Sequence, residues 1–295
     1  MEFAYNWTFA YGAPQQSATF KSSPEDFIVT ESRSEVLTGE GEHLYLLLRK
    51  TSQNTAWVAE QIAFWAGVSA RDVGYAGRKD RHAVTTQWFS VYLPGASDPT
   101  KPLLIPGVEL LQTRRHKAKL KRGQLDGNHF KITLRDIDDP QLLIPRLEKI
   151  ASDGVPNYFG DQRFGRDFNN VPHAVSLASR RKLTARGNDI YLSAARSYLF
   201  NQVVSSQVAR QEWRSETSPL WGRGRPSDAD KVILEPWIQL CDALEFTGLK
   251  QERRSSALIP LDFSWTIEQQ NLIIEFSLPA GTYATSVLRE LVKIS

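Results

Sequence analysis

Cysteine, long apolar runs and net charge are all scarce in this sequence. Cys241 is the one cysteine among 295 residues, so neither a disulfide nor a cysteine-based zinc site can form within the chain. Low cysteine use is typical of a reducing compartment, and we expect a cytoplasmic protein. No stretch approaches the roughly 18 apolar residues of a membrane helix, and residues 1–16 lack the basic and apolar segments of a signal peptide. We therefore expect no membrane partner.

Motifs for metals and nucleotide cofactors are missing as well. The five histidines show no metal-ligand spacing, and neither a Walker loop nor a GxGxxG turn after a strand occurs. We expect no metal and no cofactor. The formal net charge is only +3, but the cations gather in short clusters. That distribution fits a polyanionic partner better than general stickiness.

Aromatic residues are plentiful enough to build a large core. Eight Trp, nine Tyr and fourteen Phe disfavour disorder, and a chain of this length accommodates about two domains. Alternating or doubly apolar segments predict strands at 24–31, 43–50, 84–93, 129–136 and 272–281. Helical spacing predicts a helix capped by Asn54 or Thr55 and ending at Gly67, a long helix from near Asp189, and a last helix over 284–291.

The strand signals fall into two regions, 24–136 and 258–279, on either side of a segment with little strand signal. The economical architecture is one antiparallel-rich α+β domain interrupted by a mainly helical insertion near 152–257. Two segments of that insertion, residues 156–188 and 213–230, are rich in polar and turn-forming residues and are predicted to be irregular.

The loop GRKDRHA, residues 77–83, is the sharpest chemical feature. Asp80 lies between Arg78 and Lys79 on one side and Arg81 on the other. Neighbouring positive charge lowers the pKa of a carboxyl group and holds it ionised, and an ionised carboxylate suits a nucleophile or a base. The cations also suit the phosphates of a substrate. From charge spacing alone, a solvated loop with ordinary ion pairs is the favoured interpretation.

Three further segments have both a binding and a structural interpretation. RRHKAKLKR, residues 114–122, has six Lys or Arg in nine positions, which suits salt-sensitive phosphate contacts or a solvated face. PNYFGDQRFGRDFNN, residues 156–170, suits stacking on unpaired bases or a loop with buried aromatic rings. In LPAGTYATS, residues 278–286, Tyr283 either covers a ligand or packs at a helix start.

Four segments together resemble the tRNA pseudouridine synthase D (TruD) family. In the family's order, they are GRKDRHAVTTQWFSV (77–91), GNHFKITLRD (127–136), PNYFGDQRFGR (156–166) and LPAGTYATSVLREL (278–291). The resemblance implies an isomerase that converts a uridine of tRNA, best known at position 13, into pseudouridine without a cofactor or metal. It also implies an α+β catalytic domain with a mixed, largely antiparallel sheet at 1–151 and 258–295, and a shortened family-specific insertion at 152–257.

The same resemblance assigns roles to individual residues. Asp80 is the implied catalytic group, which attacks C1′ of the nucleotide or removes its 2′ proton, and Phe27, Asn128 and Tyr283 are implied to contact the substrate. The charge clusters, rather than the resemblance, supply the residues expected to contact tRNA phosphates, which are Arg78, Lys79, Arg81, Lys117, Lys119 and Lys121. We expect a monomer. The alternative is a non-catalytic RNA-binding protein on the same fold, while a glycosidase lacks an evident second carboxylate partner for Asp80.

Overall fold

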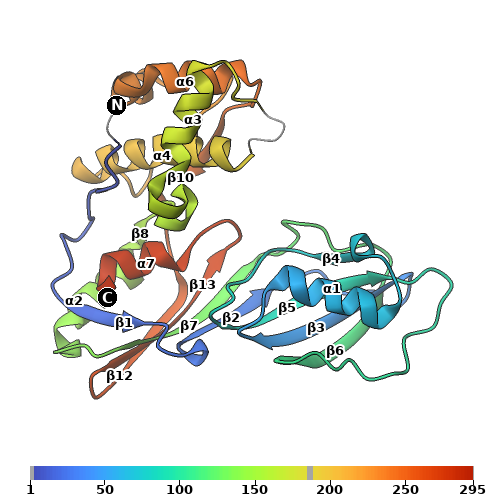
Figure 1. Cartoon of the computed structure of the whole chain (residues 1–295). Helices are drawn as coiled ribbons and strands as arrows, with labels where there is room; N and C mark the ends of the chain where they lie inside the picture. Colours follow the sequence, from blue (N-terminus) through green and yellow to red (C-terminus); the bar gives the residue numbers. More distant parts are fainter. Residues whose placement is uncertain (1–2, 185–188, 295) are drawn as a thin grey trace. The chain divides into compact units, whose positions relative to one another are not determined.

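The computed structural model describes residues 3–184 and 189–294 (Figure 1). Contacts divide the chain into two compact units, which we call the sheet unit and the helical unit. The sheet unit comprises Gln16–Leu142, Leu261–Gly281 and Ile294–Ser295, and the helical unit comprises Met1–Gln15, Leu143–Pro260 and Thr282–Lys293. The predicted domain bounds follow sequence signals rather than contacts, and they stay a prediction.

One twisted sheet forms the framework of the sheet unit. Its strands are β1 (Ser17–Phe20), β2 (Phe27–Ser32), β3 (His43–Thr51), β4 (Val73–Tyr75), β5 (Val84–Tyr92), β6 (Val108–His116), β7 (Gly127–Arg135), β12 (Leu261–Glu268) and β13 (Asn271–Pro279). The order is β12-β13-β7-β2-β5-β3-β6, with β1 on β7 and β4 on β5. β2 and β5 run parallel, whereas β7 is antiparallel to both β2 and β13 and β3 is antiparallel to both β5 and β6. The predicted α+β class with a mixed, largely antiparallel sheet is confirmed.

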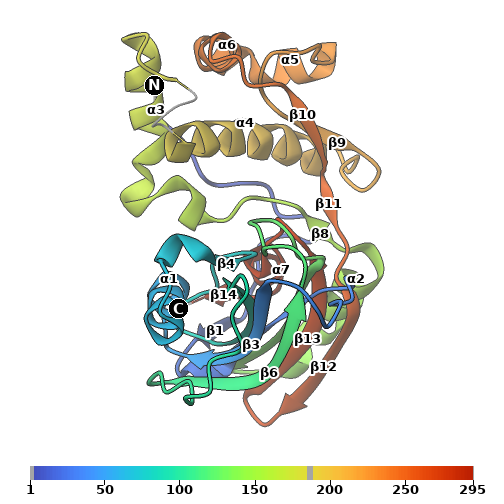
Figure 2. The ribbon, with the colours of Figure 1, turned by 90° about the vertical axis from the view of Figure 1, so that its right-hand side faces the viewer.

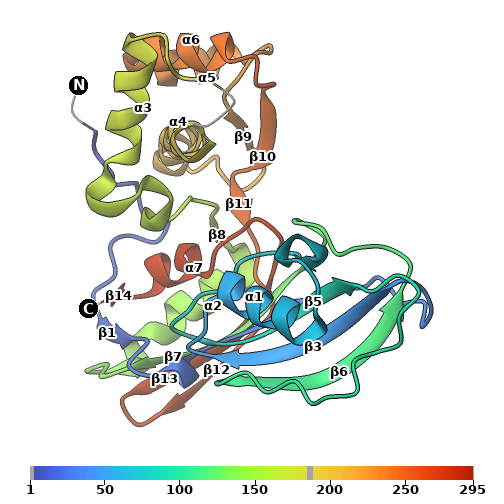
Figure 3. The same ribbon diagram turned by 45° about the vertical axis from the view of Figure 1, so that its right-hand side comes forward.

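Helix α1 (Thr55–Ala66) covers one face of this sheet. Its start is fixed by Asn54, whose Oδ1 accepts from the N–H of Ala56 at 2.8 Å, and its end by Gly67 in the left-handed region with φ 68°. Figures 1 and 3 show the helix lying across β3 and β5. Its apolar side joins a core with those strands, made of Val58, Ile62, Leu44, Leu46, Leu48, Phe89 and Val91. The predicted helix and its end at Gly67 are confirmed, and of the two predicted caps the structure uses Asn54.

The helical unit is built around the long helix α4. Its elements are α2 (Ile144–Asp153), β8 (Val155–Pro156), α3 (Asn170–Ser179), α4 (Asp189–Ala209), β9 (Thr217–Leu220), α5 (Asp228–Leu234), α6 (Ile238–Phe246), β10 (Glu252–Ser255), β11 (Ala257–Leu258) and α7 (Ala284–Leu291), while β14 (Lys293–Ile294) is divided between the units. Figures 2 and 3 show α4 between α3 and the β9–β10 pair. Aromatic rings from Trp7, Phe164 and Tyr198 meet in its core, and Cys241 of α6 is buried there too.

Two of the predicted irregular segments contain regular structure. Within 156–188 the chain forms α3, because Pro172 fits the first turn and Val171 and Ala174 are buried in the core that α4 shares. Within 213–230 it forms β9, which pairs with the distant β10. Those two predictions were wrong at these places, and the last residues of the first segment, 185–188, lie outside the described residues.

Candidate active site

The loop of residues 76–83 joins β4 to β5, and its main chain is bonded by buried polar side chains. The N–H of Lys79 donates to Oγ1 of Thr55 at 3.0 Å, and Nε2 of Gln87 donates to the carbonyl of Gly77 at 3.1 Å. Thr55 in turn donates to Oε1 of Gln87 at 3.1 Å. Both of these side chains are buried. Two buried polar side chains, one from α1 and one from β5, therefore hold the main chain of the loop in place.

The carboxylate of Asp80 is partly exposed and accepts two bonds, one from a charged side chain and one from the main chain. Nζ of Lys21 lies 2.5 Å from Oδ2, and the N–H of His82 donates to Oδ1 at 2.8 Å. Burial acts to raise the pKa of Asp80, but Lys21 and His82 outweigh it, so the pKa lies below its ordinary value. With 37% of its side chain exposed, Asp80 is an accessible, ionised carboxylate.

Phe27 and the Asp80 carboxylate both contact the ammonium group of Lys21. The ammonium of Lys21 is 4.4 Å from the centre of the Phe27 ring, a cation–π contact. The ring itself stacks on Phe130 with 6.1 Å between centroids. Lys21 therefore brings together two of the residues predicted to form the site, Asp80 and Phe27.

Strand register places Asn128 on the face that carries Phe27. β2 and β7 pair Phe27 with Ile132 and Glu31 with Asn128, and residues two or four apart in a strand point to the same side. Oδ1 of Asn128 is buried without a hydrogen-bonding partner among the described residues. A buried acceptor of this kind costs free energy unless a ligand or water satisfies it.

Lys79 points inward, in contrast to its neighbours. Its ammonium pairs with Glu31 at 3.0 Å, and the two side chains are 6% and 0% exposed. Arg78 and Arg81 are exposed. The geometry thus gives Lys79 a part in holding the loop to β2, and of these three predicted phosphate contacts it leaves Arg78 and Arg81 as the accessible cations.

Tyr283 belongs to the helical unit, where it precedes α7. Its hydroxyl accepts a hydrogen bond from Nη2 of Arg163, and Nη1 of the same guanidinium donates to Oγ of Ser193 at 2.7 Å. The Tyr283 ring meets Phe159 at a tilted angle with 6.1 Å between centroids. The residue predicted to stack on a base therefore has a polar neighbour that a phenylalanine at this position would not bind.

The basic segment 114–122 is largely exposed, but two of its lysines have partners. Lys117 pairs with Glu40 at 2.8 Å, and Nζ of Lys119 donates to the carbonyl of Arg71. Lys121 is exposed. In the longer segment 156–170, Tyr158, Phe159 and Phe164 are buried in the core of the helical unit, so the structural interpretation holds for those three rings.

Sequence reasoning missed three residues that build this site, namely Lys21, Glu31 and Lys50. Lys50 is fully buried, and its ammonium donates to the carbonyls of Gln53 and Asp80. A signal for it existed, because strand alternation places Lys50 on the side of Leu46 and Leu48 in β3. No pattern signalled Lys21, whose partner is 59 residues away.

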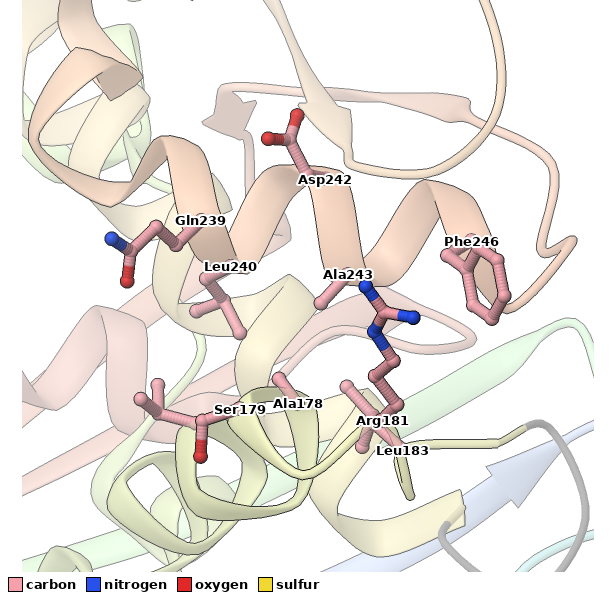
Figure 4. Close-up of a pocket in the computed structure, with 10 residues that line it drawn as sticks. Ala178, Ser179, Arg181, Leu183, Gln239, Leu240, Asp242, Ala243 and Phe246 are labelled. Carbon is pink, nitrogen blue, oxygen red and sulfur yellow. The ribbon is translucent and has the colours of Figure 1, made fainter.

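A hollow lies in the helical unit between α3 and α6 (Figure 4). Its volume is about 590 Å³, and its apolar wall consists of Val175, Ala178, Leu183, Leu240, Ala243 and Phe246. Figure 4 shows the carboxylate of Asp242 directed away from Ala178 and Leu183. The hollow is lined by none of the predicted site residues, and we do not assign it a catalytic role.

Within residues 3–184 and 189–294, no group of three or more His, Cys, Asp or Glu side chains could hold a metal ion. No helix in the described part of the chain has both the length and the apolar character needed to cross a membrane.

Comparisons with known proteins define the family. The profile of tRNA pseudouridine synthase D (TruD) matches residues 7–178. tRNA pseudouridine synthase D of Cellvibrio japonicus is 43% identical over 100% of this chain and 95% of its own length, and that of Hydrogenovibrio crunogenus is 40% identical over 98% and 96%. The crystal structure of the putative tRNA pseudouridine synthase D from Methanosarcina mazei shares the fold, with a TM-score of 0.75 at 19% identity over 100% of this chain and 99% of that one.

The fold and these matches define an RNA-modifying enzyme of the isomerase class. The chain belongs to the tRNA pseudouridine synthase D family, whose members convert uridine to pseudouridine.

Proposed function

We propose that this chain converts uridine-13 of tRNA to pseudouridine and that Asp80 is its catalytic group. The observation that carries the proposal is the state of the Asp80 carboxylate. It is accessible, it is held ionised by Lys21 and the His82 N–H, and its loop rests on buried polar side chains. These are the properties that a nucleophile or a base requires at neutral pH.

The reaction breaks the bond between N1 of uracil and C1′ of ribose and forms a bond between C5 and C1′. The proton on C5 is released and N1 gains one, so the product is an isomer of the substrate. An anionic Asp80 can form a covalent bond to C1′ and later leave it, or it can remove the 2′ proton to give a glycal that is reprotonated afterwards. Both routes need the ionised carboxylate, and both remain part of the proposal.

One side chain of the sheet unit suits an extruded uracil: the unpartnered Oδ1 of Asn128 can accept the N3–H of the base. Contacts of Phe27 and Tyr283 with the base stay predictions from the family resemblance, with Tyr283 as the stacking ring. Taking a base out of its stack costs a few kcal/mol. Exposed cations at Arg78, Arg81 and Lys121 offset that cost through phosphate contacts.

The test is Asp80→Asn, with Asp138→Asn as a matched control because Asp138 is an exposed aspartate elsewhere in the sheet unit. Each protein is incubated with unmodified tRNA, and pseudouridine is mapped at nucleotide resolution. We expect the control to modify position 13 and Asp80→Asn to bind tRNA without forming product. An active Asp80→Asn protein rejects the catalytic role, whereas product at another position rejects only the target.

Binding without any product from the unsubstituted protein would instead favour the alternative of a non-catalytic RNA-binding protein. The monomeric state and the cytoplasmic location stay predictions.

A further inference from the structure

Lys50 is a buried cation directly beneath the proposed catalytic loop. Its side chain is fully buried, and its Nζ donates to the carbonyl of Gln53 at 2.7 Å and to the carbonyl of Asp80 at 3.2 Å. Gln53 belongs to the turn that connects β3 to α1, and Asp80 belongs to the loop before β5. One ammonium group therefore ties together two turns that are 27 residues apart along the chain.

Burying the ammonium group of Lys50 costs free energy that a residue serving only to fill the core would not need to spend. Burial of an ammonium group is unfavourable unless hydrogen bonds compensate, and an unbranched apolar side chain such as methionine fills a similar volume without that cost. Burial lowers the pKa of Lys50 to about 8, with Asp80 acting to raise it and Lys79 acting to lower it. Lys79 is itself paired with Glu31 and Asp80 with Lys21, so the bonds to the two carbonyls are the direct compensation for the buried charge of Lys50.

The rest of the loop shows why the bond to Asp80 matters. The N–H of Lys79 is fixed by Thr55, and the carbonyl of Gly77 by Gln87. These two bonds hold the chain before Asp80, whereas Lys50 holds the carbonyl of Asp80 itself. That carbonyl is bonded to the Cα from which the carboxylate projects, so holding it restricts the main-chain conformation at Asp80, while Lys21 and the His82 N–H hold the carboxylate itself.

We propose that Lys50 is a positioning residue, whose buried ammonium fixes the main chain at Asp80 and thereby aims the carboxylate at the substrate. The inference rests on the proposed role of Asp80. A misplacement of about 1 Å in a reacting group can slow a reaction about 100-fold, so loss of this bond is expected to lower the rate of the chemical step while leaving tRNA affinity intact.

The first experiment compares Lys50→Met with Lys131→Met. Lys131 lies in the same sheet, and its ion pair with Glu275 is exposed. The control therefore also removes one ammonium group, but its loss should change stability little. We expect the single-turnover rate of pseudouridine formation to fall about tenfold or more in Lys50→Met, with the tRNA Kd within about twofold of the control. A Lys50→Met rate equal to that of the control overturns the proposal. If Lys50→Met does not fold, the shorter, uncharged Lys50→Gln takes its place.

The second experiment uses the unsubstituted protein. Deprotonation of Lys50 removes its positive charge and weakens its bonds to both carbonyls. We therefore expect the single-turnover rate to fall as pH rises through about 8, at saturating tRNA, and this decline to be absent from the folded Lys50 variant. A decline of the same size in the folded Lys50 variant as in the unsubstituted protein overturns the proposal.

The Asp80→Asn result separates the two proposals. An inactive Asp80→Asn protein together with a fully active Lys50→Met protein leaves the proposed function standing and rejects the positioning role. An active Asp80→Asn protein rejects both.

Discussion

The core of the helical unit is stabilised by apolar packing, whereas the buried residues around the Asp80 loop are stabilised by hydrogen bonds and an ion pair. Around Tyr198 the helical unit packs rings against rings, with Phe164, Trp7 and Tyr5 within 6.5 Å between centroids. Beneath Asp80 the sheet unit buries an ion pair, an amide, a hydroxyl and an ammonium, each with a named hydrogen-bonding partner.

The difference concerns directionality. Apolar packing depends on volume and tolerates small rearrangements, so it suits a scaffold. Hydrogen bonds and ion pairs fix distances and angles, and in a buried setting each broken one leaves a partner unsatisfied. A region that must aim one carboxylate gains from the second arrangement, and substitutions in the two regions should differ accordingly.

The largest effect on stability is expected from the apolar core. Phe164→Ala removes a fully buried ring and leaves a cavity, so we expect it to lower the free energy of unfolding by about 4 kcal/mol. Urea denaturation followed by circular dichroism measures the change. Phe246→Ala is the matched control, because that ring is 82% exposed, and its effect should stay within about 0.5 kcal/mol.

The buried ion pair of Glu31 with Lys79 allows the matching test among polar residues. Glu31→Gln leaves the Lys79 ammonium buried without its carboxylate, and we expect a loss of about 3 kcal/mol. Glu275→Gln, at an exposed ion pair, should cost less than about 1 kcal/mol. Adding Lys79→Met to Glu31→Gln should recover much of the loss, because no unpaired charge then remains buried. Equal effects of the two glutamate substitutions would contradict the assigned role of the pair.

The pH dependence of stability separates Lys50 from every apolar residue. Its pKa is about 8 in the folded chain against an ordinary value of 10.5, so between these values the unfolded chain binds more protons than the folded one. Stability from this group therefore rises as pH increases through that window, by up to about 1 kcal/mol per pH unit. Denaturation at a series of pH values should show this rise, and Lys50→Met should lack it.

Stability and catalysis are therefore expected to respond to the protonation of Lys50 with opposite sign. If the reaction rate and the unfolding free energy both rose with pH, the aiming role of Lys50 would be contradicted although its burial would not.

A smaller effect is expected at the start of α1. Asn54→Ala removes the cap on the N–H of Ala56 and should cost about 1 kcal/mol in thermal or chemical unfolding. Asn169 precedes α3 in the helical unit but makes no capping bond with its side chain. Asn169→Ala should therefore change stability by only a few tenths of a kcal/mol, and a cost equal to that of Asn54→Ala would show that capping does not explain the difference.

The smallest expected effect concerns the exposed basic segment. Replacing Lys117, Lys119 and Lys121 by Gln should leave folding unchanged, weaken tRNA binding and lower the slope of log Kd against log salt by up to about 3. The charge-matched control replaces three exposed lysines elsewhere, Lys101, Lys149 and Lys231. An identical slope in both proteins would mean that the segment does not contact RNA.

Local signals predicted most of the framework. The start and end of α1 follow from Asn54 and Gly67, and β7 and β13 from strict alternation. The helix α3 was missed because its apolar spacing is short and lies between turn-forming residues. β9 was missed because its partner β10 lies about thirty residues further on, and short strands acquire their identity from pairing rather than from propensity.

The candidate site was predictable only in part. The segment around Asp80 is distinctive in sequence, whereas the side chains that act on it come from far along the chain. Lys21 is 59 residues away, Lys50 is 30, and the pair of Glu31 with Lys79 spans 48. Charge spacing pointed to Lys79 as a phosphate contact, but sequence neighbours cannot reveal that a lysine turns inward to a carboxylate on another strand.

The buried Cys241 makes this chain well suited to fluorescence labelling. Burial raises the pKa of its thiol to about 12, with Asp242 and Glu245 contributing, so the thiolate that reacts with maleimides is scarce at neutral pH. Cysteines engineered at exposed positions, one in each unit, can therefore carry a donor and an acceptor dye on an otherwise unsubstituted background. Energy transfer between the dyes, with and without tRNA, then reports whether the two units change their separation when substrate binds.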